Sequence, residues 1–304
     1  MPPRESRRLR LARTANFGTH FTAEFADRPT HIWLPPDLAG PDDRRPVIYA
    51  WDGQSMFTGG HSISGATWQL DMALHQLARV GVELPIVVAT ESPKMRRAEY
   101  MPREGLQAVP ELAEVFTEFN GEVRSDDAID TIVEFVKPTI DALYPTRQDK
   151  DSTFLMGSSM GGLFSLYAMS RHPDVFGAAA CLSLHWAVGG APLTHVMAEM
   201  LPDPTTHRLY ADHGTTTLDA RYLDKQPVFD QLARERGWVD DENYLSLVYP
   251  RAGHSEHAWS ARLPVPLLFL LVGTQIASAL APGYGGEPTP LEVPGELLRS
   301  VGSR

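Results

Sequence analysis

The feature that most constrains this chain is an alternation of short apolar runs with longer amphipathic stretches. The runs suit buried strands, and they occur at 46–51, 84–90, 153–156, 176–182, 208–211 and 244–249. Helical patterns lie between them, at 68–80, 125–143, 163–170 and 227–236. Strands that alternate with helices need crossover connections, which make neighbouring strands parallel. We therefore predict an α/β fold with a mostly parallel central sheet flanked by helices.

The same pattern predicts one domain. Residues 30–34 add a strand near an extended N-terminal segment, and Pro138 should kink or split the helix at 125–143. Residues 259–271 should close the ordered part. With no internal repeat, we predict a single domain over 1–272 and a Gly/Pro-rich tail over 273–304.

Composition excludes several classes of function. Lys and Arg number 27 and Asp and Glu 38, a formal charge of −11, which argues against nucleic acid or a membrane surface as the main partner. The single cysteine, Cys181, excludes an internal disulfide and a multi-cysteine metal site. The basic N-terminus lacks the following apolar segment of a secretory signal. The apolar stretch 264–280 is too short for a membrane-spanning helix and is interrupted by Pro and Gly. We expect a cytoplasmic protein without a metal or cofactor.

The most informative motif is Gly157-Ser158-Ser159-Met160-Gly161-Gly162, which fits Gly-x-Ser-x-Gly with Ser159 at its centre. It follows an apolar strand and precedes a helix, where a tight turn thrusts the serine hydroxyl out of the sheet. The small glycines avoid collisions in this turn. The N–H of Met160, at the positive end of the next helix, can stabilise an oxyanion. We predict Ser159 as a nucleophile, although a Gly/Ser-rich stretch can also be a plain loop.

A nucleophilic serine needs a histidine as base and an acid to orient that histidine. After this kind of elbow the acid, Asp or Glu, comes first along the chain and the histidine comes last. The loop after the last strand holds His254 and His257, and its position favours His254 as the base. His257 lies nearer a helix start, where it would cap or pack. The acid should follow the strand at 208–211, where Asp212 and Asp219 are equal candidates by position.

Several separated motifs resemble the Putative esterase group of α/β-hydrolases, which includes esterase D, enterochelin esterases and feruloyl or acetyl-xylan esterases. The resemblance covers about residues 30 to 272. The matching segments are 51–57, 97–102, 144–146, 154–163, 172–177, 214–220 and 253–256 with Trp259.

The resemblance implies an α/β-hydrolase fold and a role for particular residues. Ser159 would be the nucleophile, and His254 the base because Trp259 stands five positions on. Asp219 matches the acid of members with a longer loop. In the esterase D pattern the acid position falls on Thr217, which cannot serve, and some siderophore esterases in the group use a Ser–His dyad. The second oxyanion donor would be the N–H of Gln54.

Four further residues follow predicted strands and are candidates for binding the substrate: Trp186, His185, Arg97 and Tyr100. An equal alternative is that Trp186 is a buried core residue and that Arg97 and Glu99 form a surface ion pair. The sequence thus predicts a serine carboxylester hydrolase that acts on a small ester through an acyl-enzyme. An acyltransferase with the same triad and a non-catalytic binding protein of the same fold are the rivals. The identity of the ester and the oligomeric state are not readable from the residues.

Overall fold

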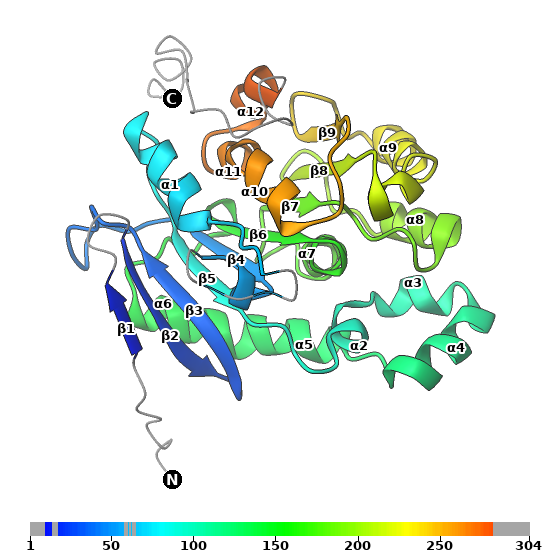
Figure 1. The fold of residues 1–304 in the computed structure, drawn as a ribbon, viewed down its shortest axis with the longest axis horizontal. Coiled ribbons are helices and arrows are strands. Elements are labelled where there is room, and N and C mark those ends of the chain that lie inside the picture. The colour runs from blue at the N-terminus through cyan, green and yellow to red at the C-terminus, as the bar shows by residue number, and fades with distance from the viewer. Residues whose placement is uncertain (1–9, 14–17, 58–59, 61, 63–64, 282–304) are drawn as a thin grey trace.

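The computed structural model describes residues 10–13, 18–57, 60, 62 and 65–281, and within them nine strands form one sheet (Figure 1). Six strands are parallel and lie in the order β5-β4-β6-β7-β8-β9. They are β4 (Val47–Trp51), β5 (Ile86–Thr90), β6 (Thr153–Ser158), β7 (Ala178–Leu182), β8 (Arg208–Gly214) and β9 (Tyr244–Tyr249). These are the six predicted apolar runs, which read as continuous apolar segments because both faces of the sheet are covered.

Three antiparallel strands extend the sheet beyond β5: β1 (Arg10–Arg13), β2 (Thr19–Phe25) and β3 (Arg28–Leu34). Ala26 and Asp27 join β2 to β3, with φ of 50° and 58°. Two left-handed residues are the pattern of a type I′ hairpin, whose twist matches that of the strands. The sequence predicted β3 and an extended segment before it, but not this hairpin.

Helices cover both faces of the sheet (Figure 1). One face carries α1 (Leu70–Arg79), α10 (Glu256–Arg262), α11 (Pro264–Leu271) and α12 (Thr274–Leu280). The other carries α2 (Arg96–Tyr100), α3 (Arg103–Gln107), α4 (Pro110–Asn120), α5 (Ser125–Thr131), α6 (Lys137–Leu143), α7 (Met160–Arg171), α8 (Gly190–Glu199) and α9 (Gln226–Glu235). Successive strand residues alternate between these two cores, so that Val47 and Tyr49 belong to the core under α2–α9 while Ile48 belongs to the core under α1 and α10–α12. The fold class predicted from the sequence is confirmed.

Short helical turns complete the chain: η1 (Gly53–Ser55), η2 (Ile132–Val136), η3 (Lys150–Ser152) and η4 (Thr217–Arg221). The turn η2 is a π-helix between α5 and α6, and the N–H of Lys137 bonds to the carbonyl of Ile132, five residues back. Pro138 has no N–H and would crowd the carbonyl four residues back in an α-helix. The wider turn therefore carries the helix through the proline.

The end of the described chain is more ordered than its composition predicts. Helix α12 buries Ile276 and Ala277 in the core beside α11, although it lies after residue 272. Residues 282–304 of the predicted tail lie outside the described residues, and the domain boundary at 272 stays a prediction. Within the part of the chain that the structure covers, no helix is both long and apolar enough to cross a bilayer.

Candidate active site

The carboxyl ends of five neighbouring parallel strands place the candidate residues in one region. Gln54 follows β4, Ser159 follows β6 and Ser183 follows β7. Asp219 and His254 lie in the loops after β8 and β9. This is the edge at which open α/β sheets bind ligands, because loops there converge above the strand ends.

The turn from β6 to α7 has the geometry of a nucleophile elbow. Ser159 has φ 55° and ψ −125°, which is strained for a residue with a side chain. Its N–H donates to the carbonyl of Leu182 on β7 (2.8 Å), and its carbonyl accepts from the N–H of Leu163 (3.0 Å), so both neighbours hold the turn. A Cβ on Gly157 would lie 2.5 Å from the carbonyl oxygen of Gly161, which explains the small residue there.

Three side chains from different loops form one hydrogen-bonded chain. Nε2 of His254 lies 2.8 Å from Oγ of Ser159, and Nδ1 of His254 lies 2.6 Å from Oδ1 of Asp219. Asp219 is fully buried, whereas Ser159 is 9% exposed. A base within hydrogen-bond distance of a hydroxyl, itself oriented by a buried carboxylate, has the geometry required to activate a nucleophile.

Asp219 is held as a carboxylate by donors on its second oxygen. Oδ2 accepts from the Ser183 hydroxyl (2.8 Å) and from the N–H of Gly214 (2.7 Å). Burial alone would raise the pKa of Asp219, but the hydrogen bonds of His254, Gly214 and Ser183 together lower it below its usual value.

Asp212, the other candidate acid, is engaged elsewhere. Its two oxygens lie 2.7 and 2.9 Å from Nη2 and Nε of the buried Arg262. The Tyr210 hydroxyl and the N–H of Ser183 also donate to it, at 2.7 and 3.0 Å. Burial opposes the charge of Arg262, but Asp212 raises the pKa of this guanidinium above its usual value. Asp212 therefore anchors Arg262 of α10.

The His254 ring is positioned by its loop and by neighbouring rings. The backbone N–H of His254 donates to Oγ1 of Thr217 (2.8 Å), and the Trp259 ring meets the imidazole edge-on with 5.0 Å between centroids. The alternative base, His257, is exposed in the first turn of α10. The structure thus brings His254 rather than His257 to Ser159.

Two backbone N–H groups, in the turns after β6 and β4, are candidates for the oxyanion hole. Met160 is the first residue of α7, so its N–H lies among the donors that a helix leaves unpaired. Gln54 lies in η1, and its side-chain amide is fixed by Ser92, with Nε2 to Oγ at 2.9 Å and the N–H of Ser92 to Oε1 at 3.0 Å. The turn before it, at Asp52, is braced by two hydrogen bonds from Arg96 (2.6 and 2.7 Å).

A cavity of about 480 Å³ lies beside Ser159. The predicted residues Arg97 and His185 line it, together with Met160. Nδ1 of His185 lies 3.4 Å from Oγ of Ser159 and 3.0 Å from the Tyr222 hydroxyl. Burial above all, with the nearby positive charges of Arg96 and Arg97, lowers the pKa of His185 to about 4, so this imidazole is neutral at pH 7.

Two predicted binding residues are core residues instead. Trp186 is fully buried against Phe229, and its indole N–H donates to Oε1 of Gln226 (2.7 Å). Tyr100 is also buried, and its ring stacks on Phe164 with 4.9 Å between centroids. The expectation that they line the pocket is wrong, because both rings fill space between helices and the sheet.

Sequence reasoning missed Ser183 and Tyr222, which contact Asp219 and His185 respectively. Ser183 directly follows β7, and this position at the carboxyl edge was the signal available for it. Nothing near Tyr222 in the sequence marks it out, since it comes after the loop that holds Asp219.

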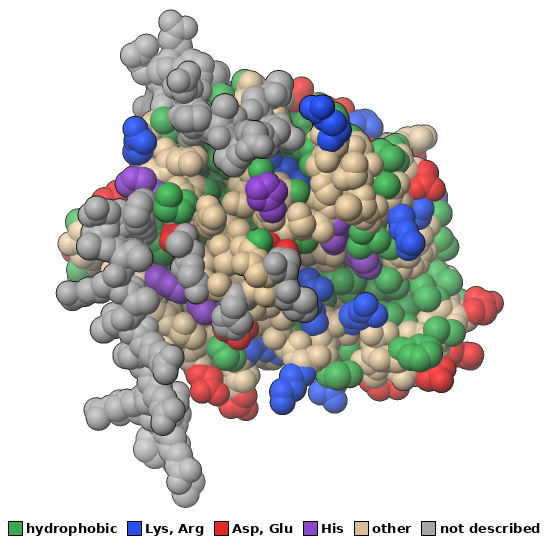
Figure 2. Space-filling view, viewed as in Figure 1, with side chains coloured by type: hydrophobic (Ala, Val, Ile, Leu, Met, Phe, Trp, Pro, Cys, Tyr) green, Lys and Arg blue, Asp and Glu red, His purple; other side chains and the backbone are tan. Residues whose placement is uncertain are grey.

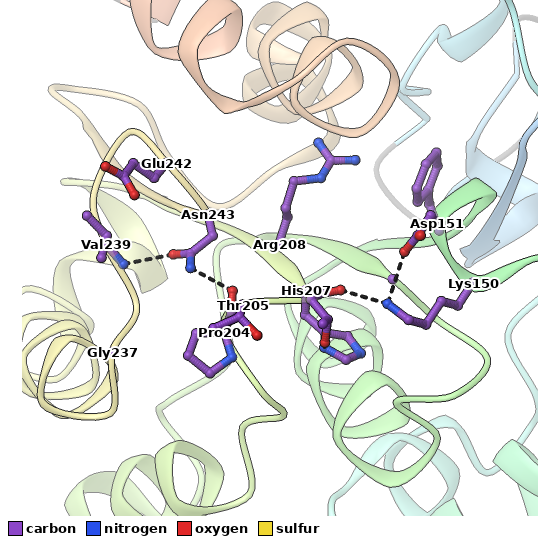
Figure 3. A pocket seen from close by; sticks show the side chains of 13 residues that line it. Lys150, Asp151, Pro204, Thr205, His207, Arg208, Gly237, Val239, Glu242 and Asn243 are labelled. Atoms are coloured by element: carbon purple, nitrogen blue, oxygen red, sulfur yellow. Dashed lines mark hydrogen bonds and ion pairs between the residues drawn. The ribbon is translucent and has the colours of Figure 1, made fainter. Parts of the chain in front are cut away.

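A larger cavity, of about 740 Å³, lies at the amino ends of the parallel strands, away from Ser159 (Figure 3). Its polar groups already bind one another: Lys150 donates to the carbonyl of Thr206 (2.8 Å) and Asn243 to that of Pro204 (2.7 Å). It is lined by residues at the amino ends of β6, β8 and β9, far along the strands from Ser159. The smaller cavity is therefore the candidate substrate site.

A mostly parallel sheet with helices on both faces and a serine on a strand–helix elbow defines an α/β-hydrolase. Residues 26–270 match the family model described as Putative esterase. The chain belongs to this family and is an esterase.

Individual proteins similar to this chain were also found. The uncharacterized protein YbbA of Bacillus subtilis (strain 168) is 24% identical over 233 residues, which are 74% of this chain and 86% of that protein. A ferulic acid esterase structure aligns with a TM-score of 0.59 and 16% identity, covering 82% of this chain and 95% of that one. An enterobactin esterase from Shigella flexneri aligns with a TM-score of 0.57 and 18% identity, covering 83% and 59%. The two structures support the fold.

Proposed function

We propose that this esterase is a serine carboxylester hydrolase that acts on a small ester through Ser159, His254 and Asp219. The observation that carries the proposal is the continuous hydrogen-bonded chain from Asp219 through His254 to Ser159. A Ser–His dyad is disfavoured, because Asp219 is buried, ionised and 2.6 Å from the imidazole.

The reaction would proceed by acyl transfer in two halves. Nε2 of His254 takes the hydroxyl proton as Oγ of Ser159 bonds to the ester carbonyl carbon. The imidazolium returns this proton to the leaving alcohol oxygen as the ester C–O bond breaks. Water then gives a proton to Nε2 of His254 as its oxygen bonds to the acyl carbon. The imidazolium returns this proton to Oγ of Ser159 as the acyl C–Oγ bond breaks, which frees the acid and regenerates the serine. Asp219 stabilises the imidazolium in both halves.

The N–H groups of Met160 and Gln54 would stabilise the negative oxygen of each tetrahedral intermediate. A single oxyanion donor contributes about 3–4 kcal/mol in comparable serine hydrolases. The elbow supports this role for Met160, since Ser159 sits directly before the first turn of α7.

The test is hydrolysis of p-nitrophenyl acetate and butyrate by the wild type and four variants. We expect Ser159→Ala and His254→Ala to lose kcat by at least about 10⁴-fold, and Asp219→Asn by about 10⁴-fold because the imidazole loses its orienting carboxylate. Asp212→Asn should keep most of the kcat of its folded fraction. Quenched-flow mass spectrometry should find the acyl group on Ser159.

Two results would count against the proposal. A folded wild type that hydrolyses these esters no faster than Ser159→Ala would argue for a non-catalytic or much narrower role. Faster product formation with added glycerol than with water alone, accompanied by glycerol esters, would favour an acyltransferase. A cytoplasmic location stays a prediction of the sequence.

A further inference from the structure

The cavity beside Ser159 has apolar walls. Helix α4 contributes Leu112, Val115, Phe116 and Phe119, and the loop after β7 contributes Ala187 and Val188. Phe119 is 76% exposed and Val115 is 51% exposed, so apolar side chains reach solvent at this cavity. Figure 2 shows hydrophobic side chains gathered over the region of α3, α4 and α8, bordered by basic side chains and histidine. A volume of about 480 Å³ suits a medium-sized apolar group.

Two arginines line the same cavity from different elements. Arg97 comes from α2, and Arg221 ends η4, just beyond the acid Asp219. Both are exposed. Within the described part of the chain, neither guanidinium has a carboxylate within ion-pair distance. The neighbouring Arg96 differs, because Asp52 binds it at 2.6 Å.

The charge at this cavity is therefore one-sided. The described residues that line it include no Asp or Glu, and His185 is neutral at pH 7. The whole chain carries a formal charge of −11, so a positive lining runs against its composition. An arginine is well suited to bind a carboxylate, since its planar guanidinium can donate two parallel hydrogen bonds.

We propose that the ester carries an anionic group on an apolar body, and that Arg97 and Arg221 bind this anion while α4 and the loop after β7 enclose the body. The inference rests on the proposed hydrolase activity and adds the substrate class. The anion can belong to the acyl half or to the alcohol half of the ester, and the test separates these two sources.

The test compares matched pairs of esters by kcat/KM. For the acyl half the pair is p-nitrophenyl hydrogen glutarate and neutral p-nitrophenyl pentanoate. For the alcohol half it is 4-acetoxybenzoate and neutral 4-acetoxybenzamide. We expect the anionic member of at least one pair to be favoured about tenfold over its neutral counterpart at low salt. The preference should shrink in 0.5 M NaCl, because the arginines are exposed to solvent.

The variants Arg97→Gln and Arg221→Gln should each reduce the anionic-to-neutral ratio about threefold, mainly through KM, because the two arginines share the anion. Arg236→Gln is the matched control, since Arg236 is exposed at the end of α9 and away from the cavity lining. It should leave the ratio unchanged.

The proposal is overturned if neither anionic ester is preferred, or if the preference survives in both arginine variants, while p-nitrophenyl butyrate hydrolysis still depends on Ser159. That result would leave the hydrolase proposal intact. If Ser159→Ala matches the wild type on all of these esters, the hydrolase proposal fails and this one fails with it.

Discussion

At the scale of single residues, Ser183 joins two acids that have different roles. Its hydroxyl donates to Asp219 and accepts from Nε1 of Trp259 and Nη2 of Arg262, each at 3.0 Å. Its N–H donates to Asp212. Both aspartates are buried, and we expect the basic side chain beside each one to decide its role. Arg262 holds its proton permanently, whereas His254 can accept and release one.

Asp212→Asn should destabilise the fold more than it harms the chemistry. Arg262 is fully buried and would lose the carboxylate that compensates its charge. Removing one member of a buried ion pair costs about 3–5 kcal/mol. Urea unfolding followed by circular dichroism should show this loss as a lower midpoint.

Asp219→Asn is the matched variant for this comparison. It removes the same charge seven positions further along the chain but leaves the Arg262–Asp212 pair in place, so its main effect should be on kcat. If Asp212→Asn keeps the wild-type midpoint and loses kcat instead, the roles of the two acids are reversed.

At the scale of elements, the β6–α7 turn tolerates side chains unequally. A Cβ at Gly157 would meet backbone, the carbonyl oxygen of Gly161 at 2.5 Å, and Cδ1 of Trp51 at 2.8 Å. A Cβ at Gly161 would meet Oδ2 of Asp52 at 3.3 Å, where a side chain can give way. The elbow therefore depends more on the first glycine than on the second.

We expect Gly157→Ala to lower the free energy of unfolding by about 1–3 kcal/mol and to reduce kcat, because relief of the clash must move the turn that holds Ser159. Gly161→Ala should cost less on both counts. Thermal unfolding and p-nitrophenyl butyrate kinetics on the two variants check this order. A milder effect at Gly157 than at Gly161 would contradict it.

The elements that the sequence revealed are those with local signals. The parallel strands read as apolar runs, and the elbow motif lies between one such strand and a helix. Helices α2, α3, α4 and α8 were missed. The first two have only five residues each, and Pro102 and Pro110 at the starts of α3 and α4 break up any long helical pattern in this region. Their buried contacts come from distant segments; the buried Tyr100, for example, stacks on Phe164 of α7.

The candidate site divides in the same way. Ser159 and His254 follow from a motif and from the last strand, both of which are local. The choice between Asp219 and Asp212 depends on Arg262, fifty residues after Asp212. No spacing rule could show that this arginine forms an ion pair with Asp212. Trp186 and Tyr100 were misplaced because position after a strand does not reveal which way a ring points.

At the scale of the whole molecule, the partly buried His185 makes stability depend on pH. The folded pKa of His185 is lowered to about 4 from an ordinary value of 6.5. As the pH falls through 6.5, His185 is protonated in the unfolded chain, but in the folded protein it stays neutral until about pH 4. Stability is therefore lost across this window. Asp219, whose pKa is also lowered, adds a loss of the same sign below its ordinary value of 3.8.

His185→Gln should weaken this dependence. His20, whose pKa is lowered to about 4 mainly by burial, contributes equally in the wild type and the variant. Between pH 7.5 and 4.5 we expect the wild type to lose on the order of 2 kcal/mol more stability than the variant, because glutamine does not bind a proton in either state. Urea unfolding at several pH values measures the difference. His257→Gln is the control, since His257 is exposed. Parallel curves for the wild type and His185→Gln would refute the assignment.

The lone cysteine has a consequence for following this protein outside a purified sample. Cys181 lies fully buried on β7, between β6 and β8, and burial raises the pKa of its thiol. Thiol reagents attack the thiolate, so the native chain should resist them until the middle of the sheet opens. Because Cys181 is the single cysteine of the sequence, the extent of its labelling would report directly how often the sheet opens, without an added tag. Rapid labelling in native buffer would reveal local opening of β7, the strand that pairs with β6 just before Ser159.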